Sequence, residues 1–299
     1  MRNRIEQALE RAFDALPGPC APPRLLAAMR HAVFPGGARI RPQLCLAVAA
    51  ACGDDEPALA EAAAIALELL HCASLAHDDL PCFDNADARR GQPSVHKAWG
   101  EPLGLLAGDA LIVMAFEGLG QAAGSPRTVT RLPALLATVA QGVGAREGIV
   151  GGQAWECEPR VDLGRYQRAK TGALFVAATC AGAQAAGRDP RPWAALGECL
   201  GEAYQVADDI RDVMGDAAAL GKPVGQDAQH GRPSAAAELG LVGAVQHFQR
   251  LMQRAVASVP DCPAREALQR LVRAESERMV PAAACDRVMR TAGLVGVAG

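Results

Sequence analysis

The chain has 299 residues, half of them hydrophobic, and a formal net charge of −3 at pH 7. This length allows a large buried core, and the charge, without any block of Lys or Arg, excludes a broadly basic nucleic-acid surface. Aromatic residues make up only 4% of the chain. With abundant Ala and few β-branched runs, this composition favours helices packed closely through small side chains.

The predicted helices follow one another with short breaks and no repeat or linker. Apolar residues at helical spacing predict helices over the ranges 3–16, 24–33, 43–52, 58–76, 102–120, 127–150, 165–187 and 193–213, with two or three more to the end, one starting near Pro263. We therefore expect one all-α domain over residues 1–299. The charged N-terminus lacks a signal-peptide apolar region, and no run of about 18 apolar residues is free of charge or Gly, which predicts no membrane span.

The ten cysteines form no CxxC pair and no regular framework. In a chain of this size they are typical of reduced, semi-buried thiols in a cytoplasmic protein.

A glycine pair precedes two arginines after the second predicted helix, in the run Gly36-Gly37-Ala38-Arg39-Ile40-Arg41-Pro42. Glycines let backbone N–H groups approach an anion closely, and guanidinium groups bind anions through paired hydrogen bonds. A helix-helix turn with surface arginines accounts for the same pattern equally well.

The first acidic cluster follows the apolar run 58–76. It holds Asp78, Asp79 and Asp84 and comes just before Arg89 and Arg90. Charges at the end of a buried helix need partners, and divalent metal with phosphate is a natural one. Asp78 and Asp84 are six residues apart and cannot share the face of a regular helix. Because Pro81 breaks a helix, we expect irregular backbone between Leu80 and Asp84 that brings the two carboxylates together.

The second acidic cluster holds Asp208, Asp209 and Asp212. Asp208 and Asp212 lie four residues apart, so on a helix they project from one face and can share divalent ions. A single Asp pair is more often a solvated helix end, but two clusters that each close an apolar helix favour metal binding. The chain has no P-loop, GxGxxG, GxSxG or HExxH motif.

Residues 215–233 are rich in Gly and Pro and carry Lys222 and Arg232. A lid over the site and an ordinary surface loop are both compatible with this composition.

Together these motifs resemble those of trans-isoprenyl diphosphate synthases (polyprenyl synthetases), and most of all bacterial geranylgeranyl diphosphate synthases of carotenoid and (bacterio)chlorophyll pathways. The resemblance covers nearly the whole chain and rests on the glycine-arginine run, both acidic clusters and these further motifs: Arg89-Arg90-Gly91, Gly108-Asp109-Ala110-Leu111, Gly151-Gly152-Gln153, Lys170-Thr171-Gly172 and Gly221-Lys222.

The resemblance implies a single large helical bundle around a central cavity, in a cytoplasmic homodimer. It also implies that an allylic diphosphate (dimethylallyl, geranyl or farnesyl) ionises with three Mg²⁺ ions on its pyrophosphate. The carbocation is then attacked by the double bond of isopentenyl diphosphate, and a proton is lost. No protein nucleophile is needed, so the protein contributes electrostatic stabilisation and orientation.

The resemblance also assigns roles to residues. The metal ligands and their supports would be Asp78, Asp79, Asp84, Asp208, Asp209 and Asp212. The allylic diphosphate would be held by Arg89, Lys170, Lys222 and Arg232, with Thr171 and Gln205 along the path of the cation. Isopentenyl diphosphate would be held by Arg41, His71 and Arg90, with Arg39 and His96 as further candidates.

Three positions depart from the family pattern. Ala38 stands where most members have a Lys on isopentenyl diphosphate, so either Arg39 compensates or that substrate binds more weakly. Arg232 replaces a Lys, which keeps the charge with another geometry. Arg211 replaces an apolar residue within the second cluster, and we expect it to pair with Asp208 or a neighbour.

Chain length is predicted from the helix ahead of the first cluster. Ala73 lies five residues before Asp78, roughly 7–8 Å down the helix, with Ser74 beside it. A large aromatic residue there would close the channel at fifteen carbons, whereas Ala73 leaves it open to Leu69 and Leu70. We therefore expect geranylgeranyl diphosphate as product. The alternatives are a farnesyl diphosphate synthase, a non-catalytic partner subunit of a heteromeric prenyltransferase, a terpene cyclase and a plain helical scaffold.

Overall fold

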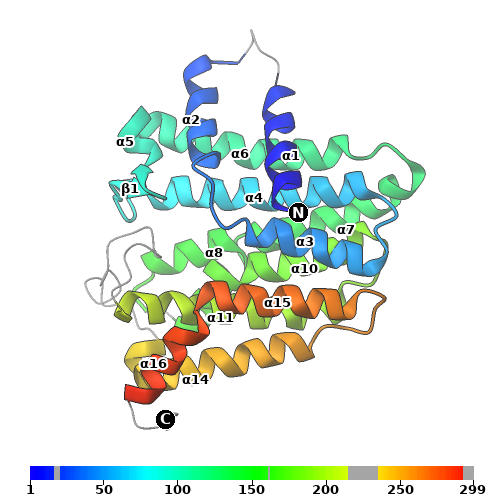
Figure 1. Ribbon diagram of the computed structural model, residues 1–299. Helices are drawn as coiled ribbons and strands as arrows, with labels where there is room; N and C mark the ends of the chain where they lie inside the picture. The colour runs from blue at the N-terminus through cyan, green and yellow to red at the C-terminus, as the bar shows by residue number, and fades with distance from the viewer. Residues whose placement is uncertain (17–20, 161, 215–234, 292–299) are drawn as a thin grey trace.

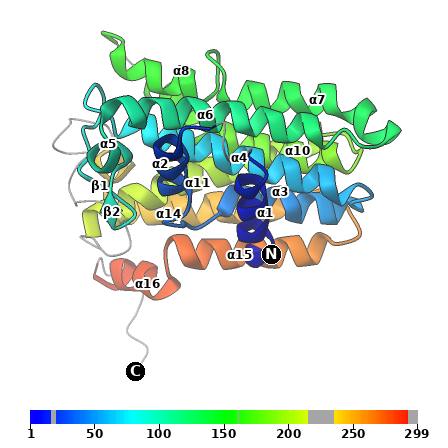
Figure 2. The ribbon, with the colours of Figure 1, turned by 90° about the horizontal axis from the view of Figure 1, so that it is seen from above.

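The structure is a computed structural model of the chain, and it describes residues 1–16, 21–160, 162–214 and 235–291. The long helices run roughly side by side as a bundle, and α1 and α2 stand across it (Figures 1 and 2). The helices of the first half are α1 (Arg2–Asp14), α2 (Pro23–Val33), α3 (Ile40–Cys52), α4 (Pro57–Asp78), α5 (Val95–Trp99), α6 (Glu101–Gln121) and α7 (Pro126–Val143). Those of the second half are α8 (Ile149–Ala154), η1 (Trp155–Cys157), α9 (Leu163–Gln167), η2 (Arg168–Gly172), α10 (Ala173–Ala185), η3 (Arg191–Trp193), α11 (Ala194–Met214), α14 (Ala235–Ala257), α15 (Arg265–Met279) and α16 (Ala282–Thr291). The all-α prediction is confirmed.

Helix α10 is the centre of the bundle. It packs against α3, α4, α7 and α11, and nearly all of its residues are buried. Its side chains are mostly small, which lets neighbouring backbones come close. A Cβ atom at Gly182 would lie only 2.3 Å from the carbonyl oxygen of Cys45 in α3. The predicted close packing through small residues is therefore present in the core.

Two predicted helices are divided in the structure. The range 127–150 is broken because Gly144 and Gly148 both have extended backbone, so α7 ends at Val143 and α8 begins at Ile149. The range 165–187 consists of α9, the π-helical turn η2 and α10. The π-helical turn carries Lys170 and Thr171, and such turns occur frequently at functional sites.

Two helices, α4 and α6, are long and apolar enough to cross a membrane by length and composition alone. Of their most apolar windows, 67% of α4 and 39% of α6 is buried inside the protein. Helix α4 is thus a core helix, which agrees with the predicted buried run. Helix α6 keeps much of its apolar surface exposed, including Leu105, Leu106 and Val113.

A short hairpin follows α4 and supplies two of the predicted arginines. Strands β1 (Ala88–Arg89) and β2 (Gln92–Pro93) pair antiparallel through two residues each. Arg90 and Gly91 form the turn, and both have positive φ, at 54° and 76°. Such a two-residue turn matches the twist of paired strands and directs Arg90 back toward α4. All the cysteines in the described ranges are free, in line with the predicted reduced state.

Candidate active site

The first acidic cluster lies where α4 ends. The helix stops at Asp78, and the residues after it form turns around Pro81. In these turns the Asp84 N–H donates to the carbonyl oxygen of Asp78 (3.0 Å). The predicted break between Leu80 and Asp84 is therefore confirmed, and it brings the backbone of residue 84 back to the end of the helix.

Asp79 and Arg89 form a buried pair within this cluster. Asp79 is 1% exposed, and its Oδ1 accepts from Arg89 Nε at 3.0 Å. Burial raises the pKa of Asp79 although Arg89 opposes the shift, while the carboxylates around Arg89 raise its pKa against the effect of burial. Arg89 Nη2 also lies 3.8 Å from Asp78 Oδ2. Asp79 thus fixes the arginine beside Asp78.

Lys170 of η2 reaches the same cluster from the opposite side. Its Nζ donates to Asp78 Oδ1 (3.1 Å) and to Glu156 Oε1 (2.7 Å). Glu156 also accepts from the Tyr166 hydroxyl (2.6 Å) and from Gln153 Nε2 (2.9 Å). Sequence reasoning missed Glu156 and Tyr166. A signal for Glu156 was present, because it follows the motif residue Gln153 by three positions, which is the spacing of neighbours on a helix.

The second acidic cluster lies on the last turns of α11. Asp209 is 2% exposed and accepts from Gln205 Nε2 (3.1 Å) and from the Ala235 N–H (2.7 Å). Thr171 of η2 in turn donates to Gln205 Oε1 (3.1 Å). Arg211 Nη2 donates to Asp208 Oδ1 (3.0 Å), which confirms the predicted pairing.

The turn η2 therefore connects the two acidic clusters. Lys170 contacts Asp78 of the first, and its neighbour Thr171 leads through Gln205 to Asp209 of the second. Helices α4 and α11 are 130 residues apart at these positions (208 − 78), yet two consecutive residues of one turn bridge them. Figure 1 places the ends of α4 and α11 at the same end of the bundle.

The acidic side chains suit Mg²⁺ more than a closed structural metal site. Within the described ranges, no three His, Cys, Asp or Glu side chains are grouped so as to hold a metal ion by themselves. Mg²⁺ takes only one or two carboxylates and completes its coordination with waters and substrate phosphate. Two sets of hard carboxylate oxygens, with cations between them, are suited to that shared coordination.

A group of cationic side chains lies beside the first cluster, on α3, α4 and the hairpin. The Arg41 guanidinium stacks on the rings of Phe175 (4.6 Å) and Tyr204 (5.7 Å), and Arg41 is 7% exposed. Its Nε has no hydrogen-bond partner in the part of the chain that the structure describes, and burial lowers its pKa. Burial and the nearby Arg41 and Arg90 hold the pKa of His71 well below its usual value, so His71 is neutral.

Arg90 completes this group, which we call the cation pocket (Arg41, His71 and Arg90). Its guanidinium lies over Gly37, where a Cβ atom would be only 2.7 Å from Arg90 Cζ. Gly37 also has a φ of 144°, which disfavours other residues. The glycine pair therefore makes room for a guanidinium from the hairpin, that of Arg90.

Two of the predicted substrate ligands, Arg39 and His96, are bound to other residues of the protein. The Arg39 side chain is fully buried and its nitrogens bind Glu6, Glu68 and the Val33 carbonyl. His96 is 5% exposed, and its Nδ1 lies 3.0 Å from Ser94 Oγ. Both side chains are thus held by other parts of the protein in this structure, and their roles in binding isopentenyl diphosphate stay predictions.

The predicted chain-length residues are packed in the core. Leu69, Leu70 and Ala73 are at most 3% exposed, and Ser74 Oγ donates to the His71 carbonyl (2.8 Å). A cavity of about 1050 Å³ is lined by residues of α7, η2, α10, α11 and α14, including Gln205 and Asp209, and by none of α4. This cavity does not test a channel along α4, and the role of Ala73 stays a prediction. Lys222, Arg232 and the predicted lid at 215–233 lie outside the described residues.

Comparisons with known proteins agree with this geometry. The model of the polyprenyl synthetase family matches residues 22–269. The chain is 53% identical to a geranylgeranyl diphosphate synthase of Cereibacter sphaeroides, over 96% of this chain and 99% of that protein. It is 51% identical to the synthase of the same name from Rhodobacter capsulatus, over 94% and 98%. Its fold is similar to that of a geranyltransferase from Helicobacter pylori complexed with magnesium and isoprenyl diphosphate, with a TM-score of 0.77, 29% identity and coverage of 92% and 95%.

Proposed function

Because this chain belongs to the polyprenyl synthetase family and is a trans-prenyltransferase, we propose that it couples isopentenyl diphosphate to an allylic diphosphate and releases geranylgeranyl diphosphate. One observation supports the assignment of this reaction to the site between the two acidic clusters. Lys170 and Thr171 connect the two acidic clusters, so that a diphosphate bound between the clusters meets carboxylates on both sides and a cation at the centre.

Asp78 and Asp84 would hold two Mg²⁺ ions and Asp208 a third, with Asp212 supporting the last. When bound, these ions would neutralise charge on the pyrophosphate as it leaves. Asp79 and Asp209 have a different task. Each is buried and holds another side chain in place, Arg89 in the first cluster and Gln205 in the second.

The first chemical step breaks the allylic C–O bond, and both electrons stay with the departing pyrophosphate. Lys170 and Arg89 lie on either side of Asp78 and supply fixed positive charge where this negative charge develops. Thr171 and Gln205 present oxygen dipoles toward the site and stabilise the allylic cation. Glu156 and Tyr166 hold Lys170 in position. Lys222 and Arg232 would add cations from outside the described residues.

The cation pocket would bind the diphosphate of isopentenyl diphosphate. Arg41 is buried on two aromatic rings and Arg90 is held above Gly37, so both guanidiniums are ordered before the anion arrives. Neutral His71 donates a hydrogen bond without adding a third like charge. The double bond of this substrate then attacks the allylic cation, and a proton is lost from the adduct.

An elongation assay tests the function. The purified protein is incubated with Mg²⁺, labelled isopentenyl diphosphate and each allylic primer, and the products are sized by chromatography. A twenty-carbon product supports the proposal. A product of fifteen carbons would assign the chain as a farnesyl diphosphate synthase. The absence of elongation with every primer would favour a non-catalytic partner subunit.

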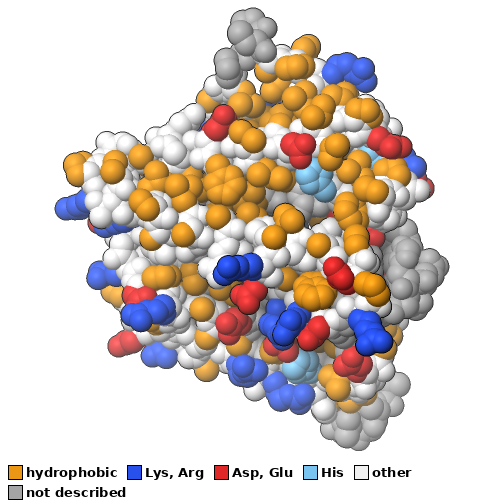
Figure 3. Space-filling model, turned by 180° about the vertical axis from the view of Figure 1, so that it is seen from behind, with side chains coloured by type: hydrophobic (Ala, Val, Ile, Leu, Met, Phe, Trp, Pro, Cys, Tyr) orange, Lys and Arg blue, Asp and Glu red, His pale blue; other side chains and the backbone are white. Residues whose placement is uncertain are grey.

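We propose a cytoplasmic location for the protein, and the exposed face of α6 supports a homodimer in which a second copy of the chain covers this face. Leu105, Leu106 and Val113 are 48%, 49% and 56% exposed. Figure 3 shows many hydrophobic side chains across the upper half of the face opposite to the view of Figure 1. A charge at the centre of such a patch opposes its burial. Leu106→Glu should therefore give a monomer in analytical ultracentrifugation, and an unchanged dimer would place the interface elsewhere.

A further inference from the structure

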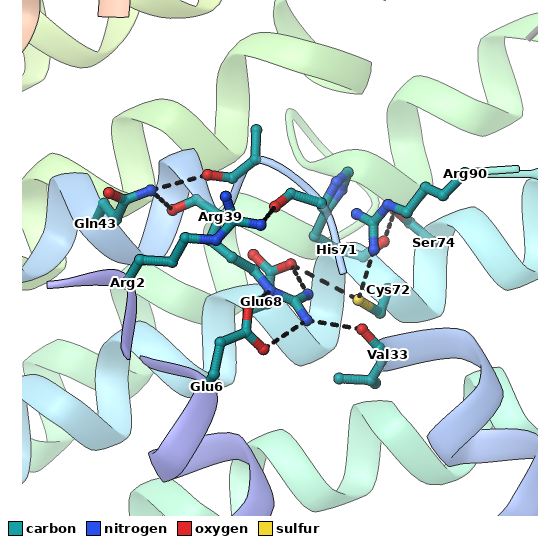
Figure 4. A network of polar contacts seen from close by, with 12 residues as sticks. Arg2, Glu6, Val33, Arg39, Gln43, Glu68, His71, Cys72, Ser74 and Arg90 are labelled. Carbon is teal, nitrogen blue, oxygen red and sulfur yellow. Dashed lines mark hydrogen bonds and ion pairs between the residues drawn. The ribbon is translucent and has the colours of Figure 1, made fainter. Parts of the chain in front are cut away.

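A buried network joins four segments of the chain beneath the cation pocket (Figure 4). Arg39 donates from Nη1 to Glu68 Oε1 (2.6 Å), from Nε to Glu6 Oε1 (3.0 Å) and from Nη2 to the Val33 carbonyl (2.8 Å). Glu68 is 1% exposed and lies on α4. The network therefore fastens the loop before α3 to α1, α2 and α4 at one point.

Arg39 holds the loop in a conformation that needs support. It has left-handed backbone, with a φ of 50°, directly before α3 begins at Ile40. A residue with a side chain adopts this conformation rarely and is kept there by its surroundings. Nearby carbonyls are fixed as well, that of Ala38 by Gln43 Nε2 (2.8 Å) and that of Gly37 by Arg2 Nη2 (3.1 Å). The anchored Arg39 therefore sets the start of α3, and with it the place of Arg41 two residues later.

Cys72 extends the network to Arg90. It follows Glu68 by one helical turn, and its Sγ lies 3.9 Å from Glu68 Oε1 and 4.0 Å from Arg90 Nη1. Burial, together with Glu68, raises the pKa of this thiol to about 11, so the thiol stays protonated. A thiol can donate weakly to the carboxylate while its sulfur faces the guanidinium. Glu68 is thus linked to both arginines of the cation pocket.

The cation pocket also depends on Glu68 for charge balance. Arg41 and Arg90 have no carboxylate partner within the described ranges. The two carboxylates nearest to them in the network, those of Glu6 and Glu68, form ion pairs with Arg39. Because Glu68 is almost fully buried, its charge is poorly screened by water. It therefore acts on the neighbouring guanidiniums as well as on Arg39.

From these contacts we propose that Glu68 is a positioning residue for the isopentenyl diphosphate pocket: through Arg39 it places Arg41, and through Cys72 it places Arg90. The proposal deepens the function proposed above and rests on it for the identity of the ligand. It predicts a selective effect on one of the two substrates.

The test compares Glu68→Gln with the wild-type enzyme. Gln keeps the size of the side chain and a hydrogen-bond acceptor but removes the charge. We expect KM for isopentenyl diphosphate, and its Kd measured by calorimetry without primer, to rise about tenfold. KM for the allylic primer should stay within about twofold, because the acidic clusters do not depend on Glu68.

The matched control is Asp55→Asn, which breaks the ion pair of Asp55 with Arg131 (2.6 Å) near the other end of α4. This variant should lower Tm and leave both KM values unchanged. The proposal is overturned if Glu68→Gln behaves like the control, or if it raises both KM values equally. If Glu68→Gln does not fold, Cys72→Ala decides, with an expected rise of about threefold in KM for isopentenyl diphosphate alone. A wild-type protein that elongates no primer would instead overturn the proposed function.

Discussion

The acidic clusters and the cation pocket lie side by side, and they differ in how their charged side chains are paired. In the acidic clusters the carboxylates already have cations beside them: Lys170 and Arg89 next to Asp78, and Arg211 on Asp208. In the cation pocket, Arg41 and Arg90 have no carboxylate partner in the part of the chain that the structure describes. The acidic clusters therefore combine carboxylates with cations of the protein, whereas the two guanidiniums of the cation pocket are placed to receive an added anion.

Because of this difference, we expect the two diphosphate substrates to differ in whether they need Mg²⁺ to bind. A diphosphate that enters between the acidic clusters has to bring Mg²⁺ with it, because carboxylates alone repel it. A diphosphate that enters the cation pocket meets guanidiniums and a neutral histidine, and needs no metal. The proposed function thus places a metal-dependent and a metal-independent diphosphate site side by side near the end of α4.

Substitution of Asp78 should have the largest effect, because it impairs the acidic clusters, where Mg²⁺ is proposed to bind, and leaves the cation pocket intact. We expect Asp78→Asn to lower kcat about a thousandfold, since the variant loses a carboxylate that would hold the Mg²⁺ ions on the departing pyrophosphate. Calorimetric binding of isopentenyl diphosphate without Mg²⁺ should be unchanged. Asp87→Asn is the control, because Asp87 lies in the same stretch, is highly exposed and pairs with Lys97. Equal losses in both variants would mean that the clusters act only as a charged surface.

Arg41→Met tests the cation pocket. We expect KM for isopentenyl diphosphate to rise about a hundredfold, because a buried guanidinium that faces an anion is lost. Met fits against the rings of Phe175 and Tyr204, so Tm should stay equal or rise when an unpaired buried charge is removed. The exposed Arg127→Met is the control for loss of a positive charge. A large fall in Tm without a change in KM would instead assign Arg41 a structural role.

The sequence was sufficient to predict what depends on local patterns. Pro81 predicted the break after α4, the spacing of Asp208 and Asp212 placed both on α11, and small residues predicted the tight core around α10. The contact between Arg211 and Asp208 was also predictable, because residues three apart on a helix are neighbours.

Contacts between distant segments were not predictable in the same way. Arg39 and Arg41 stand two residues apart in one motif, yet one is fully buried on two glutamates and the other faces the site. The difference arises from the left-handed backbone at Arg39, which no local pattern specified. For Glu156 the spacing from Gln153 was a local signal, but its contact with Lys170, fourteen residues away on η2, was not predictable from that spacing.

Ala73→Tyr tests a part of α4 that belongs neither to the acidic clusters nor to the cation pocket. Ala73 is 1% exposed and lies more than one turn before Asp78. An added aromatic ring below the clusters should shorten the main product from twenty to fifteen carbons. KM for isopentenyl diphosphate should change by no more than about twofold. Product analysis by chromatography is the measurement, with Ala73→Ser as the small-residue control, and an unchanged product length would contradict a floor at this position.

His71→Gln gives the smallest expected effect. It removes the titratable side chain of the cation pocket and therefore tests the electrostatics of that pocket directly. The pKa of His71 lies well below its usual 6.5 in the folded protein, because the residue is buried beside Arg41 and Arg90. Between that lowered value and 6.5 the unfolded chain binds the extra proton and the folded protein does not. The free energy of unfolding should therefore fall as the pH drops below 6.5, by up to about 1.4 kcal/mol per pH unit.

The His71→Gln variant should lack this contribution, since Gln does not titrate and the other histidines are present in both proteins. Urea unfolding of both proteins at about pH 7.5, 6.5 and 5.5 measures the difference. A gap that widens only on the acid side means that burial and the neighbouring Arg41 and Arg90 together keep His71 neutral in the folded protein. Saturating isopentenyl diphosphate should close that gap, because the bound diphosphate compensates the two arginines and lets His71 accept its proton. Curves that stay parallel at every pH would contradict a lowered pKa of His71 in the folded protein.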